Sequence, residues 1–456
     1  MKHPMLKGST LAAAVFLASH ATAGGFDNSS RGFDIIYGDN NVVTFSYGQS
    51  SVPMKANIDK MQRSESSLAE ASVSKVSGSG EILDNFTRPQ VGIRYNLNEN
   101  TSCATQIEKP FAAGVAYEDD ALSYTVTNDF GAPIDSNGNP TGDVTQMQFK
   151  SAPITTKYDS DSITFACGYD IALSKGEVKI FGGPKLQSVS GEFDEDLTPS
   201  ADVTGSNDNL FVELDGGYEA GYILGAAYSI PEIALRASIL YHSQIDYDAT
   251  GTISAKVPGL GSFTTDAKAK TFTPQTVEIA LQSGIAENTL AFLKLRWSEY
   301  GKLASLNVDG NDDGRIDGGL ASVGEFDLAA GADGGLANPE VSMFSNDTFD
   351  YSFGLGRRVN DQLSLGASFS GSIKLGGKSD DTPLGADATS LRLPGDTAHT
   401  VSFGGEYTVI PKLKVNGGLG FTFIDEYRVE TTSNSYRAEF DKTEAVSFQM
   451  GVTYEI

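Results

Sequence analysis

A short acidic stretch that begins at residue 309 has the spacing of a calcium-binding loop. Oxygen-bearing side chains occupy its first, third, fifth and ninth positions: Asp309, Asn311, Asp313 and Asp317. Glycine at the sixth position and isoleucine at the eighth complete the pattern of an EF-hand-type loop. The twelfth position should hold a bidentate carboxylate but is Leu320, so calcium binding requires another acid such as Glu325. An acidic turn without metal is the alternative.

Basic side chains recur on the polar face of segments that alternate between polar and apolar residues. They are Arg94, Lys179, Arg236, Lys294 and Arg296, opposed by Glu108, Glu219, Glu278 and Glu406. An arginine that faces an interior can hold a ligand carboxylate, because it offers both charge and a bidentate fit. We take Arg236 and Arg296 as the main candidates for ligand binding, with Lys294 and Arg94 beside them. The alternative is a network of ion pairs that fills the interior and anchors the N-terminal segment.

The residues of the mature chain do not point to an enzyme. It has two histidines, His242 and His399, and no G-x-S-x-G motif that would position a nucleophile. We assign no catalytic residue and expect no cofactor apart from calcium in the acidic loop. The formal charge of −26 also argues against a nucleic-acid partner, because the phosphate backbone would repel it.

The N-terminus carries an export signal. Lys2 and Lys7 precede an apolar stretch, and Ala21-Thr22-Ala23 has the small side chains of a cleavage site. We therefore assign 1–23 to a signal peptide. No other stretch approaches the ~18 consecutive apolar residues of a membrane helix, so we expect a secreted, periplasmic or outer-membrane protein.

The last twelve residues alternate without interruption and predict a strand with one apolar face. Val446, Phe448, Met450, Val452, Tyr454 and Ile456 share that face. This stretch also resembles the C-terminal signal of outer-membrane β-barrels, with Ile456 in place of the usual phenylalanine. The alternative is an edge strand of a soluble β-protein.

The same period of two recurs along the chain and predicts about fourteen strands. Tight turns rich in Asn, Asp and Pro alternate with longer polar segments. The longer segments are 58–86, 113–157, 192–208, 247–270, 306–345, 373–391 and 430–437. Short turns at one end and long loops at the other are typical of a transmembrane antiparallel barrel. We predict an all-β barrel over 42–456, both termini on the periplasmic side, and a short periplasmic or plug segment over 24–41.

Several runs resemble the FadL family of outer-membrane transporters. They are Thr271–Gly284, Thr289–Gly301, Tyr351–Arg358 and Leu391–Asp396. The resemblance implies a fourteen-stranded barrel, plugged at its N-terminus, that admits long-chain fatty acids or other hydrophobic molecules by passive diffusion. The plug here is shorter than is usual in the family and lacks an Asn-Pro-Ala element, so gating by plug movement is in doubt. A hydrophilic porin and a surface adhesion or structural barrel are the alternatives.

The stretch Lys109-Pro110-Phe111-Ala112-Ala113-Gly114 ends the predicted third strand. Proline cannot donate to a strand ladder, and glycine loosens the chain after it. In the resembled family the third strand is kinked inward, which implies a lateral opening toward the lipid. The alternative is that Pro110 only ends pairing before a long loop. We expect a monomer that contacts outer-membrane lipid and a hydrophobic small molecule.

Two cysteines lie on the predicted third and fourth strands. Cys103 and Cys167 both fall on outward faces near the turn end of those strands. The compartment permits a disulfide, but the shear of a barrel can slide the two residues apart. We expect two separate lipid-facing thiols that act as small apolar residues.

Overall fold

The structure is a computed structural model. It describes residues 32–38, 40–60, 81–117, 124–128, 145–150, 154–196, 200–201, 209–257, 261–302, 305–310, 340–342, 347–375, 398–430 and 436–456. The predicted signal peptide lies outside these residues, as does most of the acidic loop. Among the residues described, no helix is long and apolar enough to cross a membrane.

The strands form a closed antiparallel barrel, which confirms the predicted fold class. Its first six strands are β1 (Val42–Ser51), β3 (Phe86–Asn96), β4 with β5 (Thr101–Glu108, Ala112–Tyr117), β8 with β9 (Ile154–Asp159, Ser162–Ala172), β10 (Glu177–Asp196) and β12 (Asn209–Ile230). The next three are β13 with β14 (Leu235–His242, Ile245–Val257), β15 with β16 (Gly261–Thr273, Thr276–Ala286) and β17 (Thr289–Ser298). The last five are β20 (Asp347–Arg358), β21 (Leu363–Leu375), β22 (Ala398–Ile410), β23 (Leu413–Ile424) and β26 (Thr443–Glu455), which makes fourteen.

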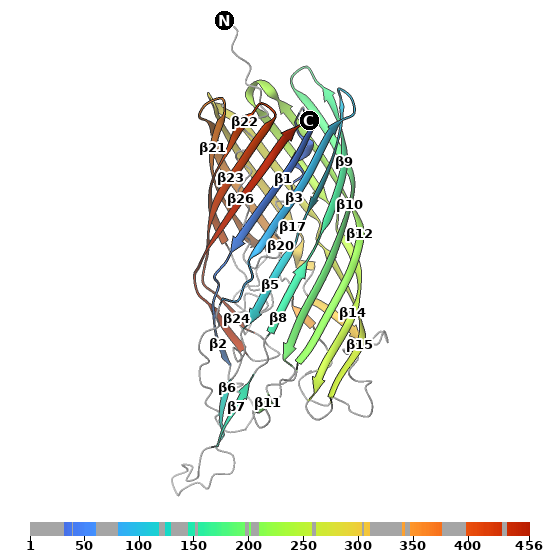
Figure 1. Ribbon diagram of the computed structural model, residues 1–456, viewed down its shortest axis with the longest axis vertical. Coiled ribbons are helices and arrows are strands. Elements are labelled where there is room, and N and C mark those ends of the chain that lie inside the picture. Colours follow the sequence, from blue (N-terminus) through green and yellow to red (C-terminus); the bar gives the residue numbers. More distant parts are fainter. Residues whose placement is uncertain are drawn as a thin grey trace.

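Short elements complete the described chain. They are η1 (Asp34–Ile36), η2 (Pro231–Ile233), η3 (Tyr300–Lys302), β18 (Ser305–Gly310) and β19 (Glu340–Ser342). Two small sheets are formed by β2 (Ala56–Lys60), β24 (Tyr427–Glu430) and β25 (Tyr436–Phe440), and by β6 (Tyr124–Asn128), β7 (Thr145–Lys150) and β11 (Ser200–Ala201). Both small sheets lie toward the end of the barrel opposite the short turns (Figure 1).

The first and last strands close the barrel. β1 pairs along its whole length with β26 on one side, from Val42 opposite Glu455 to Ser51 opposite Val446, and with β3 on the other. The start of β1 and the end of β26 lie at the end that carries the short turns (Figure 1). In outer-membrane barrels the short turns are periplasmic and the long loops external. We call these the turn end and the loop end.

Side chains alternate between an apolar outer face and a polar inner face near the turns. In β9, for example, Ile163, Phe165 and Tyr169 are exposed on the outside, whereas Ser162 and Thr164 are buried inside. Exposed tyrosines border this apolar belt near the turns: Tyr95, Tyr169, Tyr407 and Tyr454. Aromatic girdles at the edges of an outward apolar band are typical of a membrane barrel.

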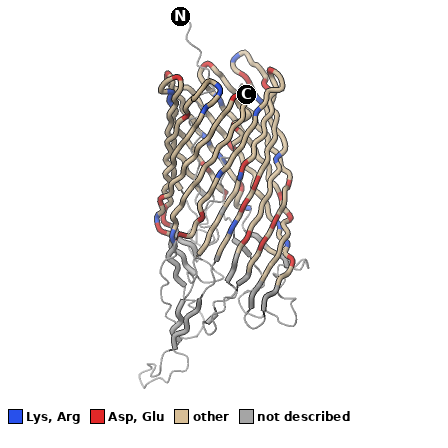
Figure 2. Tube along the Cα trace, viewed as in Figure 1, with Lys and Arg blue, Asp and Glu red and all other residues tan. Residues whose placement is uncertain are grey.

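Several strands extend well past the belt, and here the predicted loops are wrong. The segment 247–270 was expected to be a loop, but β14 and β15 pair from Ile245 opposite Thr273 to Val257 opposite Gly261. Charged residues occupy the outer face of this extended wall, as Figure 2 shows on the strands from β8 to β15. The physical reason is that a strand outside the bilayer can carry polar groups outward.

The expectation of two separate thiols is also wrong. The antiparallel register places Cys103 of β4 directly opposite Cys167 of β9, with the two Cα atoms 4.0 Å apart, and the sulfurs are bonded. The register between β4 and β9 is unbroken from Thr101 to Glu108. The two cysteines are therefore not offset along the strands. The disulfide therefore ties the third strand to the fourth near the turn end.

Candidate functional site

The third strand is interrupted at Lys109 and Pro110. On the turn side of this point, β3 and β4 pair regularly, and their last pair is Gln90 opposite Glu108. Beyond it β5 pairs with β8, whereas Phe86 to Pro89 of β3 pair only with β1 in the described chain. Proline has no N–H to donate. In the described chain the ladder between the second and third strands is thus interrupted at Lys109 and Pro110.

The second and third strands meet again farther toward the loops. The Asp84 N–H donates to the Gly114 carbonyl at 2.9 Å, and the Ala116 N–H donates to the Ile82 carbonyl at 2.8 Å. A side chain at position 114 would collide with the Asp84 carboxylate, so glycine permits this approach. We call the interval between the Gln90–Glu108 pair and the Asp84–Gly114 hydrogen bond the wall opening.

Side chains at the wall opening point in opposite directions. Lys109 lies outside, where its Nζ contacts Asp159 Oδ1 at 2.6 Å and Asp161 Oδ1 at 3.3 Å. Phe111 is buried, with 2% of its surface exposed, and packs edge-on against Tyr158 at 6.4 Å between ring centroids. The strand therefore presents a charged side chain to the outside and an aromatic ring to the inside within three residues.

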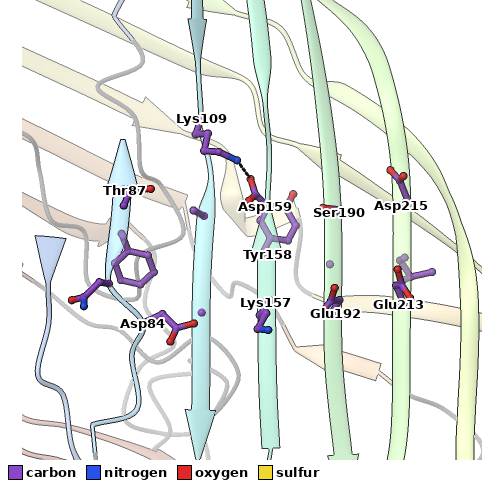
Figure 3. Close-up of a pocket in the computed structure, with 16 residues that line it drawn as sticks. Asp84, Thr87, Lys109, Lys157, Tyr158, Asp159, Ser190, Glu192, Glu213 and Asp215 are labelled. Atoms are coloured by element: carbon purple, nitrogen blue, oxygen red, sulfur yellow. Dashed lines mark hydrogen bonds and ion pairs between the residues drawn. The ribbon is translucent and has the colours of Figure 1, made fainter. Parts of the chain in front are cut away.

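A cavity of about 470 Å³ lies at the wall opening. Residues from both sides of the opening line it, including Phe86 and Thr87 of the second strand and Lys109 and Gly114 of the third. Its floor continues across β8, β10 and β12 (Figure 3). The opening is thus more than a missing set of backbone hydrogen bonds, because it has room for part of a ligand.

The turn half of the lumen, between the turns and the wall opening, is filled by the N-terminal segment. Phe33 and Ile36 are buried against Phe181, Ile223 and Leu240 of the wall. This packing covers apolar surface that would otherwise face an open pore. The described residues of the predicted plug, Gly32 to Tyr37, therefore lie inside the barrel.

Two of the predicted ligand-binding cations hold this segment. Arg94 Nε donates to the Ile36 carbonyl at 3.2 Å and its Nη1 to the Asn40 carbonyl at 2.7 Å. Arg236 lies 4.2 Å above the Tyr37 ring and 3.7 Å from Asp34. Burial raises the pKa of the Tyr37 phenol, and the charge of Asp34 adds to this, so the ring stays neutral beneath the guanidinium.

The other two predicted cations form ion pairs inside the wall. Lys294 contacts Glu278 at 2.9 Å. Arg296 donates from Nε and Nη2 to Asp350 Oδ2 at 2.8 and 2.7 Å, and both side chains are 5% exposed. These contacts match the interpretation of a network that fills the interior and anchors the plug. A ligand carboxylate would have to compete with them.

The loop half of the lumen, beyond the wall opening, is apolar instead. Its buried cluster comprises Val52, Met54, Ile82, Leu83, Phe86, Val115, Tyr117, Ala398, Ile424, Phe440 and Ala445. Phe86 belongs both to this cluster and to the lining of the cavity. Apolar packing therefore extends from the loop half to the wall opening.

A comparison with protein families decides what this arrangement is. The profile of the family described as outer membrane protein transport protein (OMPP1/FadL/TodX) matches residues 39–456. The chain belongs to this family. It is therefore an outer-membrane protein of the group that transports hydrophobic compounds. Comparison with curated proteins finds no match.

Solved structures show the same fold. A FadL homologue of Pseudomonas aeruginosa is 13% identical over 97% of this chain and 100% of that chain, with a TM-score of 0.65. The toluene transporter TodX of Pseudomonas putida is 14% identical over 97% and 99% of the two chains, with a TM-score of 0.53. The toluene transporter TbuX of Ralstonia pickettii is 13% identical over 96% of each, with a TM-score of 0.52. At these identities the likeness concerns the fold alone.

The predicted calcium loop is only partly described in this FadL-family barrel. Asp309 lies in β18, where it is opposite Lys268 of β15. Asn311, Asp313 and Asp317 lie outside the described residues. No group of three or more metal-ligating side chains occurs in the part of the chain that the structure covers. Calcium binding stays a prediction.

Sequence reasoning missed the acidic side of the wall opening. Glu192, Glu213 and Asp215 line the cavity, but residue 192 was expected to begin a loop. β10 in fact continues to Asp196 and pairs with β12 down to Asn209. The alternation of apolar and polar residues could have predicted this longer strand, since the buried Val212 and Leu214 flank the exposed Glu213.

Proposed function

We propose that this barrel takes up hydrophobic compounds, long-chain fatty acids being the expected class, by passive diffusion and releases them through the wall opening. The observation that carries the proposal is the contrast inside the lumen. A buried apolar cluster lies between the loop end and the opening, whereas the plug segment and the interior ion pairs lie toward the turns. The apolar contacts that could favour a hydrophobic ligand therefore extend from the loop end as far as the opening.

Release through the wall is favoured by solvation. Returning an apolar chain to water costs about 0.8 kcal/mol per CH2 group. A chain of about sixteen carbons would lose roughly 12 kcal/mol by leaving through an aqueous pore. Release beside the bilayer avoids this cost, so no energy source is required. We propose that the barrel works as a monomer, since the route lies within one chain.

The test is uptake by cells that lack their own transporter. Expression of this protein should restore influx of a labelled long-chain fatty acid or of toluene. Replacing Lys109–Gly114 with a regular alternating strand should close the opening and reduce influx to background. A matched control replaces Ala249–Ser254 of β14, six residues in an unbroken ladder, and should transport normally.

Two results would decide against the proposal. If influx persists after the opening is closed, the ligand leaves by another route. If the natural chain restores no influx of either ligand, the transport assignment itself fails for these compounds. Heat-modifiable mobility on gels, measured for each variant, shows whether the barrel has formed.

A role for Arg236, Arg296, Lys294 and Arg94 in holding a ligand carboxylate also stays a prediction. Each of these side chains contacts plug or wall groups. Replacing Lys294 with Met should weaken binding of a fatty acid but not of toluene if the role is real. Equal effects on the two ligands would indicate a purely structural role.

A further inference from the structure

The wall opening lies where the outer face of the barrel changes from apolar to charged. One cross-strand row on the turn side is apolar: Val91, Ile107, Ile163, Leu186 and Ala220 follow one another by register. Two rows farther toward the loops, Asp159, Ser190 and Asp215 lie side by side. A ligand that leaves the opening therefore meets the charged edge of the belt as well as hydrocarbon.

The charge at this edge is predominantly negative. The cavity is lined by five carboxylates and two ammonium groups: Asp84, Asp159, Glu192, Glu213 and Asp215 against Lys109 and Lys157. Lys109 is already engaged by Asp159 and Asp161. Glu192 and Glu213 are directly opposite each other on β10 and β12, and both are exposed. Figure 3 shows these carboxylates across the floor of the cavity.

The lumen side of the opening carries charges of both signs. Arg88 lies in the part of β3 that borders the opening, and its Nη2 donates to Ser50 Oγ of β1 at 2.8 Å. Glu108, at the edge of the opening, is buried on the same inner side, so the charges of Arg88 and Glu108 offset each other. The excess of carboxylates outside therefore produces the field that opposes outward movement of an anion. The same field does not act on a neutral molecule.

We infer that the wall opening passes its ligands in uncharged form and discriminates against carboxylate anions. This inference rests on the proposed release through the wall. It narrows the ligand class at that step to hydrocarbons, alcohols, esters and protonated acids. The charges select by repulsion, as in other recognition sites that exclude a competitor rather than bind the preferred ligand more tightly.

The test compares two labelled ligands of equal chain length, a fatty acid and the corresponding fatty alcohol. Influx is measured at neutral pH in cells that lack their own transporter. The natural chain should admit the alcohol faster than the acid. The triple variant Glu192→Gln, Glu213→Gln, Asp215→Asn should raise acid influx about fivefold, the size expected for removing a few partly screened charges. Alcohol influx should not change.

A matched variant controls for overall charge. Glu232→Gln, Glu287→Gln and Asp361→Asn remove three exposed carboxylates from the turns, far from the opening. This control should leave influx of both ligands unchanged. All six positions are exposed on the outer surface or in turns, so folding should be unaffected; gel mobility checks this.

Each outcome has a distinct meaning. Acid influx that stays low in the triple variant, or rises equally in the control, overturns the inference while leaving release through the wall intact. Equal influx of acid and alcohol through the natural chain also overturns it. If neither ligand enters above background, the proposed function fails, and this inference fails with it.

Discussion

The two halves of the barrel distribute polarity in opposite ways. In the turn half, charges such as Arg296 and Asp350 lie inside and apolar side chains such as Ile163 and Phe165 lie outside. In the loop half, Phe86 and Val115 lie inside, whereas Glu192 and Glu213 lie outside. The change occurs at the wall opening. The difference shows that the solvent outside a strand determines which residues its outer face can carry.

The interiors of the two halves also differ in the solutes that they favour. The turn half contains the plug segment and buried ion pairs, whereas the loop half contains a buried apolar cluster. A hydrophobic molecule and an ion therefore meet different obstacles. Four measurements test this difference between the two halves.

Removing the plug should have the largest effect. Deleting residues 32–38 takes away the packing of Phe33 and Ile36 and the contacts of Arg94 and Arg236. Ion conductance in planar bilayers should change from nearly closed to an open channel. If the natural chain already conducts ions like a porin, the plug does not seal the lumen and the porin alternative gains support.

Breaking an interior ion pair should destabilise the turn half strongly. Asp350→Asn leaves Arg296 buried without its carboxylate, which typically costs about 3–5 kcal/mol. Urea unfolding, followed by loss of heat-modifiable mobility, measures the change. Lys302→Ala breaks a pair whose lysine is 59% exposed and should have little effect. Equal losses in both variants would show that interior pairing is not special.

Removing the disulfide should have an intermediate effect. The bond closes a separation of 64 residues, and replacing both cysteines with serine should lower the unfolding free energy by about 2–4 kcal/mol. The midpoint of denaturant unfolding reports this. Reduction of the natural, denatured chain should add the mass of about two protons. No mass change would mean that the thiols are separate after all.

Neutralising one outer carboxylate should have the smallest effect, with the opposite sign. Glu213→Gln removes a like charge directly opposite Glu192 and should stabilise the barrel by roughly 0.2–1 kcal/mol. The same unfolding assay measures it against the Asp350→Asn variant. A loss of stability would show that Glu213 has a favourable partner and that the outer row is not under repulsion.

The sequence alone determined the fold class, the number of strands and the loss of one ladder donor at Pro110. A period of two identifies strands and separates their two faces, and proline removes a ladder hydrogen bond in any context. Turn residues mark where the chain reverses. Each of these signals is local, so Ala445 to Ile456 or Pro110 could be interpreted without knowing their neighbours.

Which residues meet could be learned only from the three-dimensional arrangement of the strands. Cys103 is opposite Cys167, and Arg296 pairs with Asp350, because cross-strand register joins positions far apart in the chain. Alternation also does not say which face is inside: β14 reads as a polar loop until its apolar face is seen to turn inward. Register and the position of the bilayer are properties of the closed barrel, and no single strand contains them.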